Sequence, residues 1–268
     1  MAASGCDVDL LETAREPGAA RHGNFINYYT FNPPENRLRL IPRTLLQDVA
    51  PPHGGEHDDG EVVLVLDVGC NSGLTACYGN FKDLTVALYK HLQVDRSSGS
   101  ETHGRLHLLG CDLDEDLILR AVRSNPFPET ISFIPLDITQ DSTFRTQLEG
   151  YLGSFGRSTF DLCVCLAVTM WVHLNHGDAA LLELLSRLAS LCHRLLLEVQ
   201  PWKCYRSAAR RMRKLGRQDF EHFRELKIQG DMAKHATQYL EKQCGMKLVC
   251  CFGSTTWDRT LLLFSRDK

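Results

Sequence analysis

The chain has 268 residues, 43% of them hydrophobic and 24% charged, with a formal net charge of −3. These values are typical of one large globular domain, and no apolar run approaches the roughly 20 residues that span a bilayer. Because the net charge is slightly negative, any nucleic-acid binding must come from a local basic patch.

Two features bear on the compartment of the protein. The opening Met-Ala-Ala-Ser-Gly-Cys-Asp lacks the basic and apolar regions of a secretory signal, so we expect none. The eleven cysteines include no C-x-x-C pair, and several stand within apolar runs, where cysteine behaves as a small hydrophobe. We therefore expect reduced core thiols in a cytosolic or nuclear protein.

The first part of the chain divides into three segments. Residues 1–22 are predicted to be disordered. Residues 23–49 are predicted to cover a single domain that spans 23–268, because the aromatic residues near their start are too frequent for a tail. Residues 50–61 form a polar, turn-rich linker.

The apolar run at 62–68 predicts a buried parallel strand. It leads into Gly69 and Gly73, whose backbone freedom permits a sharp turn and the close approach of a ligand. The spacing D-x-G-x-x-x-G from Asp67 differs from the dinucleotide fingerprint. It is closer to the loop that holds S-adenosylmethionine in Rossmann-like methyltransferases. The alternative is an ordinary turn between a strand and a helix.

Strands and helices alternate along the rest of the chain. Alternation of this kind predicts an α/β fold, with a mostly parallel seven-stranded sheet and helices on both faces. The last two strands are separated by turn residues, which predicts a C-terminal antiparallel hairpin. Further strands are predicted at 105–111, 131–136, 160–166, 193–199, 246–252 and 259–265, and helices at 83–92, 114–124, 141–153, 178–192, 203–215 and 219–242, with a polar loop at 95–104.

Three successive strands end in carboxylates that would meet at one edge of the sheet. Asp67 closes the first strand, and Asp112 and Asp137 follow the next two. A carboxylate accepts hydrogen bonds from ribose hydroxyls and from the adenine amine, so Asp112 suits a ribose and Asp137 an adenine edge. The alternative for a single aspartate is a helix N-cap, which is the role expected for Asp114.

The block Thr-Met-Trp-Val-His-Leu-Asn-His-Gly-Asp at 169–178 follows the strand that would face a transferred methyl group. Two histidines three residues apart are one possible metal pair, but no further ligand has fitting spacing, so no metal is expected. Asp178 is expected to cap the next helix. The side chains expected to shape an acceptor pocket are Trp171, His173, Asn175 and His176.

The segment from Lys203 to Arg217 carries seven basic residues and no acidic one. On a helix, a basic stripe would lie opposite an apolar stripe that runs from Tyr205 to Leu215. Such a stripe is usually only a solvated face. This one begins at the carboxyl end of a strand, where substrates bind, which favours a phosphate-rich partner. The basic residues are Lys203, Arg206, Arg210, Arg213 and Arg217, with Arg211 and Lys214 beside them.

Three motifs together resemble one known family. They are Asp-Val-Gly-Cys-Asn-Ser-Gly at 67–73, Trp-Val-His-Leu-Asn-His-Gly-Asp at 171–178 and Gln-Pro-Trp-Lys-Cys-Tyr at 200–205. With Gly-Asn-Phe at 23–25, they are similar to motifs of the bicoid-interacting-protein-3 family of RNA 5′-phosphate methyltransferases. The chain is most similar to the cytosolic branch, which acts on the 5′-monophosphate of histidine tRNA and of some microRNA precursors. The small-nuclear-RNA capping branch is less similar.

The resemblance covers about residues 23–266 and implies a Rossmann-like fold, S-adenosylmethionine as cofactor, a cytosolic location and no metal. We also expect a monomer. Carried over position by position, the cofactor contacts would be Arg37, Asn71, Asp112, Asp137, Ile138 and Leu166, beside Asp67 and Gly69 of the turn.

The acceptor chemistry follows from the state of a terminal phosphate. Its second pKa is near 6, so it is largely dianionic at neutral pH and needs no strong base. Catalysis would depend mainly on positioning. Lys203 and Arg206 are expected to clamp the phosphate, His173, Asn175 and His176 to donate hydrogen bonds to it, and Arg210, Arg211, Arg213 and Lys214 to hold the RNA backbone.

The chain departs from the family pattern at two places. Residues 74–82 are interposed before Asp83, where we expect the next helix to begin, with the insert looping out near the cofactor. Val199 stands in the place of a proline, with a minor expected effect. Two other functions stay open: methylation of a different acceptor, and non-enzymatic RNA binding with a cofactor site impaired by the insert.

Overall fold

The computed structural model describes residues 19–25, 28–46, 62–71, 83–93 and 105–266. Within them, one seven-stranded sheet has the order β3-β2-β1-β4-β5-β7-β6, and β7 alone runs antiparallel to its two neighbours. The predicted sheet with its C-terminal antiparallel hairpin is confirmed. The strands are β1 (Val63–Val68), β2 (Leu106–Asp112), β3 (Ile131–Pro135), β4 (Phe160–Leu166), β5 (Cys192–Val199), β6 (Met246–Ser254) and β7 (Thr260–Arg266).

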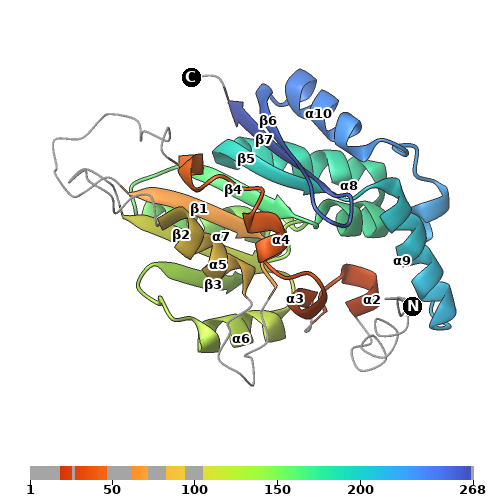
Figure 1. Ribbon diagram of the computed structural model, residues 1–268, viewed down its shortest axis with the longest axis horizontal. Coiled ribbons are helices and arrows are strands. Elements are labelled where there is room, and N and C mark those ends of the chain that lie inside the picture. The colour runs from red at the N-terminus through yellow and green to blue at the C-terminus, as the bar shows by residue number, and fades with distance from the viewer. Residues whose placement is uncertain (1–18, 26–27, 47–61, 72–82, 94–104, 267–268) are drawn as a thin grey trace.

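Helices cover both faces of the sheet (Figure 1). Alternate residues of β1 point to opposite faces, so Leu64 and Leu66 join the core under α7, α8 and α10, and Val63 and Val65 join the core under α5 and α6. The helices are α2 (Ala19–His22), α3 (Tyr28–Phe31), α4 (Glu35–Leu38), α5 (Leu84–Gln93), α6 (Glu115–Ser124), α7 (Asp141–Gly153), α8 (Thr169–Leu191), α9 (Trp202–Lys214) and α10 (Met232–Gln243), with 3-10 turns η1 (Arg43–Leu46) and η3 (Glu221–Arg224).

The N-terminal segment packs against the core on the α5 side of the sheet. Tyr29, Ile41 and Leu45 are buried there, and the Tyr29 hydroxyl donates a 2.8 Å hydrogen bond to the carbonyl of Cys70. The prediction of disorder is wrong at residues 19–22, because these form α2. Residues 1–18, the linker expected at 50–61 and the loop expected at 95–104 lie outside the described residues.

Two helices begin at aspartates, as predicted. Asp83 precedes α5 and accepts the N–H of Val86 at 3.1 Å. Asp114 precedes α6 and accepts the N–H of Asp116 at 3.0 Å. These side-chain acceptors satisfy amide groups that have no partner within the helix. The insert at 74–82 lies outside the described residues.

Two helix predictions are wrong in their bounds. The helix expected at 178–192 begins at Thr169 and is kinked at Gly177, which has φ 82° and ψ −177°. The helix expected at 219–242 is broken into η3 and α10. Gly230, with φ 80°, stands in the break, and α10 begins after Asp231. Positive φ is incompatible with a right-handed helix, and glycine adopts it at little cost.

The cysteines that the structure describes are free. Five of them on or beside β1, β2, β4 and β5 are buried, which confirms the prediction of core thiols for Cys70, Cys111, Cys163, Cys165 and Cys192. On β6, Cys250 is half-buried and Cys251 is exposed. Burial raises the pKa of the Cys70 and Cys111 thiols well above the usual value. No helix in the described ranges combines the length and the apolar character that crossing a membrane requires.

Candidate active site

A pocket opens at the carboxyl ends of the central strands. β1 pairs with β2 on one side and with β4 on the other, so the order of the sheet reverses at this point, where ligands bind in open α/β sheets. We call it the first pocket. It brings together all eight residues expected to contact a cofactor: Arg37, Asp67, Gly69, Asn71, Asp112, Asp137, Ile138 and Leu166. Their role as ligand contacts stays a prediction.

Two buried carboxylates stand at the base of this pocket. Burial raises the pKa of Asp67 to about 7 and the pKa of Asp112 to about 6. Asp67 accepts a 2.8 Å hydrogen bond from the hydroxyl of Thr85, and Asp112 accepts the N–H of Asn71 at 2.9 Å. Both carboxylates remain costly to ionise in this place, so a ligand that brings hydrogen-bond donors or positive charge would stabilise them.

The raised pKa of Asp67 predicts a pH-dependent stability. Between about pH 4 and pH 7 the native state holds a proton that the unfolded state releases, so the free energy of unfolding falls as pH rises. We expect Asp67→Asn to remove this dependence on pH. At pH 8 its free energy of unfolding should exceed that of the parent by at least about 1 kcal/mol. Urea unfolding at pH 5 and pH 8 measures it. Asp116→Asn, which removes an exposed carboxyl of α6, is the control; equal gains in the two variants would contradict the prediction.

Residues 21–25, which we call the strap, lie along one side of the first pocket. His22, Gly23 and Asn24 line the pocket. Asn24 donates a 2.6 Å hydrogen bond to Asp114, and its own Oδ1 is buried with no hydrogen-bond partner among the described residues. An unpartnered buried acceptor beside the carboxylates fits a ligand that carries several donors.

Asn175 holds the strap in place. Its Nδ2 donates to the carbonyl of Arg21 at 2.8 Å and to that of Trp171 at 2.9 Å. The Arg21 guanidinium lies 3.4 Å from Asn175 Oδ1 and stacks on the ring of Phe220. The structure therefore gives Asn175 a role in supporting the pocket wall, and not the direct phosphate contact expected of it.

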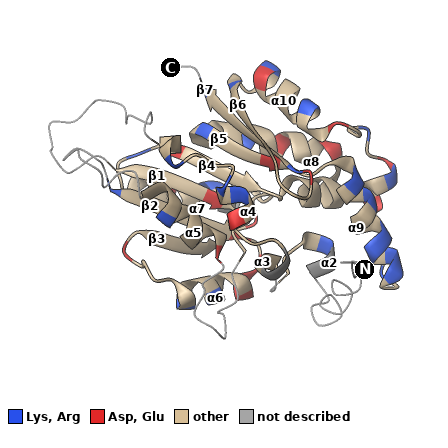
Figure 2. Cartoon of the chain, in the orientation of Figure 1, with Lys and Arg blue, Asp and Glu red and all other residues tan. Residues whose placement is uncertain are grey.

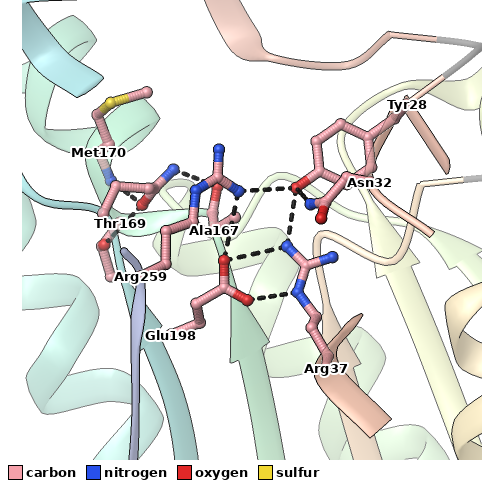
Figure 3. A network of polar contacts seen from close by, with 9 residues as sticks. Tyr28, Asn32, Arg37, Ala167, Thr169, Met170, Glu198 and Arg259 are labelled. Carbon is pink, nitrogen blue, oxygen red and sulfur yellow. Dashed lines mark hydrogen bonds and ion pairs between the residues drawn. The ribbon is translucent and has the colours of Figure 1, made fainter. Parts of the chain in front are cut away.

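A buried polar network adjoins the first pocket (Figure 3). Glu198 pairs with two guanidinium groups: that of Arg37, through both oxygens, and that of Arg259, at 3.3 Å. Tyr28 accepts hydrogen bonds from the same two groups at 2.8 and 3.0 Å. Burial would raise the pKa of Tyr28, but the charges of Arg37 and Arg259 outweigh it and lower the pKa. Two cations thus share one carboxylate, and the cluster favours an anion nearby.

A second pocket adjoins the first. Tyr28, Ala167 and Trp171 line both. Ala167 holds a left-handed conformation, with φ 63°, and its carbonyl accepts a 2.7 Å hydrogen bond from Gln200. This contact fixes Ala167, which directly follows β4, between the two pockets. The charged side chains of the second pocket are all cationic: Lys203, Arg211 and Arg259.

Helix α9 presents its basic residues to two separate places, which divides the stripe predicted from the sequence. Lys203 and Arg211 line the second pocket, where the Arg211 guanidinium lies 4.9 Å from the ring centre of Phe25. A groove on another side of the helix is lined by Arg206, Arg210 and Arg213 with Trp202, Phe223, Arg224 and Gln229. Figure 2 shows the basic residues along α9. Arg206, expected to clamp the phosphate beside Lys203, lies in the groove instead.

His173 is buried, with 0% of its surface exposed, and lines neither pocket. Its Nδ1 lies 3.1 Å from the Tyr205 hydroxyl and its Nε2 lies 2.7 Å from Asp178. Burial lowers its pKa although Asp178 opposes the shift. Asp178 also accepts the N–H groups of Lys227 and Ile228, at 2.8 and 3.2 Å. The expectations of phosphate contact for His173 and of helix capping for Asp178 are therefore corrected: both hold neighbouring segments together.

The other two members of the expected acceptor set line the first pocket. His176 is exposed at its edge, and Trp171 lines both pockets. Among the described residues, no group of three or more His, Cys, Asp or Glu is placed to hold a metal ion.

Sequence reasoning missed two residues of the second pocket, Trp257 and Arg259. They come from the turn between β6 and β7, far along the chain from the other residues of the site. One signal was present, since Arg259 directly precedes an apolar strand and its charge would need a buried partner there.

The chain is similar to several known proteins. The family model of Bicoid-interacting protein 3 (Bin3) matches residues 160–266. The chain is 64% identical over 257 residues to the pre-miRNA 5′-monophosphate methyltransferase of Danio rerio, covering 96% of each chain. It is 50% identical over 264 residues to the RNA 5′-monophosphate methyltransferase of Homo sapiens, covering 95% of this chain and 86% of the other. The bifunctional kinase-methyltransferase WbdD superposes with a TM-score of 0.49 at 19% identity, over 86% of this chain and 39% of its own.

Proposed function

The chain belongs to the family of RNA 5′-monophosphate methyltransferases, and we propose that it methylates the 5′-monophosphate of a small RNA with S-adenosylmethionine as donor. The observation that carries the proposal is the junction of two pockets with opposite character. Three carboxylates and the Arg37 guanidinium stand in the first, the charged side chains of the second are all cationic, and Tyr28, Ala167 and Trp171 line both. A group transferred between ligands in the two pockets would cross this junction.

The first pocket fits the methyl donor. Asp112 and Asn24 offer acceptors for ribose hydroxyls, and Asp67 offers a carboxylate for the amino group. Arg37 offers positive charge for a carboxylate. Asp137 and the apolar Ile138 would flank the adenine. When bound, S-adenosylmethionine supplies a methyl group on a sulfonium: a phosphate oxygen takes the methyl, and sulfur keeps the electron pair of the broken bond.

The second pocket fits the terminal phosphate. Lys203, Arg211 and Arg259 would bind and orient a dianion, and guanidinium groups suit phosphate oxygens through paired N–H donors. The Arg259 guanidinium pairs with Glu198 and donates a hydrogen bond to the Tyr28 hydroxyl, so its position is fixed before the RNA binds. The phosphate is already a nucleophile at neutral pH, and the chain supplies no proton transfer. Its contribution is positioning.

The substrate proposal extends to the identity of the RNA. Relatives from Danio rerio and Xenopus laevis are named for pre-miRNA. We propose microRNA precursors and histidine tRNA as substrates, a cytoplasmic location and a monomeric enzyme that uses no metal. These finer points rest on the family resemblance, and the groove on α9 supports an extended RNA rather than a mononucleotide.

The groove on α9 predicts a salt-dependent contribution to RNA binding. Phosphate contacts release counterions, so Arg210→Ala with Arg213→Ala should weaken RNA binding and reduce the slope of log K against log salt by about 1.4. Fluorescence anisotropy at several salt concentrations measures the slope. Replacing Arg105 and Arg123 by alanine, both outside the site, is the matched control for lost charge. An unchanged slope in the groove variant would exclude this assignment.

The decisive experiment compares three RNAs of one sequence that end in a 5′-monophosphate, a triphosphate or a hydroxyl. With a labelled methyl donor, we expect label on the monophosphate RNA and none on the hydroxyl RNA. Label on the hydroxyl RNA would indicate that the methyl group goes to an acceptor other than the 5′-phosphate. RNA binding with no label and no binding of S-adenosylhomocysteine would indicate a non-enzymatic RNA-binding protein, and deletion of 74–82 would then test whether the insert blocks the pocket.

A further inference from the structure

The turn between β6 and β7 carries an acidic residue at the edge of the cationic second pocket. Trp257 and Arg259 line that pocket, and Asp258 stands between them. The Asp258 carboxylate lies 3.0 Å from Lys203 Nζ, and 69% of its surface is exposed. A carboxylate at a phosphate-binding pocket opposes anion binding, so its presence there requires an explanation.

The backbone fixes this residue firmly. Asp258 has a φ of 61°, and its N–H donates a 2.8 Å hydrogen bond to the carbonyl of Thr255, whose own N–H donates to the carbonyl of Arg259 at 2.9 Å. Arg259 is held in turn by Tyr28 and Glu198 (Figure 3). The turn is thereby tied to the buried network, which holds the backbone of Asp258 beside the pocket.

From this geometry we propose that Asp258 selects RNA ends that carry a single phosphate, by repelling the additional negative charge of a diphosphate or triphosphate. The inference rests on the proposed function. One phosphate is matched by the three cations of the pocket, whereas each further phosphate adds negative charge within reach of the Asp258 carboxylate. Specificity of this kind comes from a repulsive contact with the wrong ligand.

The pairing of Asp258 with Lys203 does not by itself neutralise the pocket. Both side chains are more than half exposed, and an exposed ion pair is weak and screened by salt. Lys203 can therefore exchange its partner for the RNA phosphate. The carboxylate remains at the rim and acts on whatever extends beyond the first phosphate.

The test compares monophosphate and triphosphate RNAs of one sequence. Asp258→Asn and Asp258→Gly both tolerate the left-handed backbone. We expect each to raise the triphosphate-to-monophosphate ratio of kcat/KM by about tenfold relative to the parent. Asp219→Asn removes a carboxylate 4.0 Å from Arg213, a residue of the groove, and should leave the ratio unchanged.

Salt gives an independent readout. Because Asp258 is exposed, the parent's preference for the monophosphate should shrink between about 0.05 M and 0.5 M salt, and the preference of Asp258→Asn should change less. Equilibrium binding of the two RNAs gives the same comparison without catalysis. An unchanged ratio in both Asp258 variants overturns the inference. A parent protein that neither binds nor methylates monophosphate RNA overturns the proposed function, and the inference with it.

Discussion

Replacing Arg37 by methionine is expected to lower the free energy of unfolding by about 3 kcal/mol or more. Arg37 is 1% exposed and its partner Glu198 is 0% exposed, so the pair is removed from water. Loss of Arg37 removes its hydrogen bonds to both Glu198 oxygens and leaves Arg259, 3.3 Å away, as the other cation paired with this buried carboxylate. The pair also joins α4 to β5. Urea unfolding measures the change, provided that the m-value stays constant.

A surface ion pair supplies the control for this prediction. Glu183 pairs with Arg187 four residues on, and it is 59% exposed. Glu183→Gln should cost less than about 1 kcal/mol, because exposed pairs contribute little. If Arg37→Met costs no more than Glu183→Gln, the network around Glu198 does not hold the N-terminal segment to the sheet.

Replacing Gly23 by alanine is expected to weaken the binding of S-adenosylhomocysteine by about 100-fold. Gly23 has φ 74°, and a Cβ there would lie 2.2 Å from the Trp171 indole. The strap would have to move away from Trp171, and with it Asn24, which lines the first pocket. A displacement of about 1 Å in a binding element is enough for a loss of this size. Isothermal titration calorimetry measures the affinity.

The control separates the lost contact from backbone strain. Gly216, at the end of α9, has a similar φ of 63°, and a Cβ there would meet nothing within 4 Å. Gly216→Ala should therefore cost about 1 kcal/mol of stability and leave the affinity unchanged. Equal affinities in the two variants would show that the strap does not form a wall of the binding site.

The strands were predictable because their signal is local. Buried parallel strands are continuous apolar runs, and each of the seven runs in the sequence became a strand of the sheet. The carboxylates of Asp67 and Asp112 were predictable for a related reason, since parallel strands end at one edge. The kink inside α8 and the start of α10 were not, because Gly177 and Gly230 adopt positive φ values that residue type permits but does not require.

The sequence on its own therefore determined the α/β sheet, the edge at which the first pocket opens and the family to which the chain belongs. The motif at 67–73 and the acidic strand ends were sufficient for the sheet edge, and the family followed from that motif together with those at 171–178 and 200–205. They left open which way each side chain of the acceptor region faces.

Only the tertiary structure decided the acceptor side. His173 turned out to be enclosed by Tyr205 and Asp178, and α9 is rotated so that Arg211, and not Arg206, joins Lys203. The rotation of a helix about its axis and the burial of a side chain depend on packing against distant segments. The same packing brings the turn between β6 and β7 beside Lys203, which local periodicity does not encode.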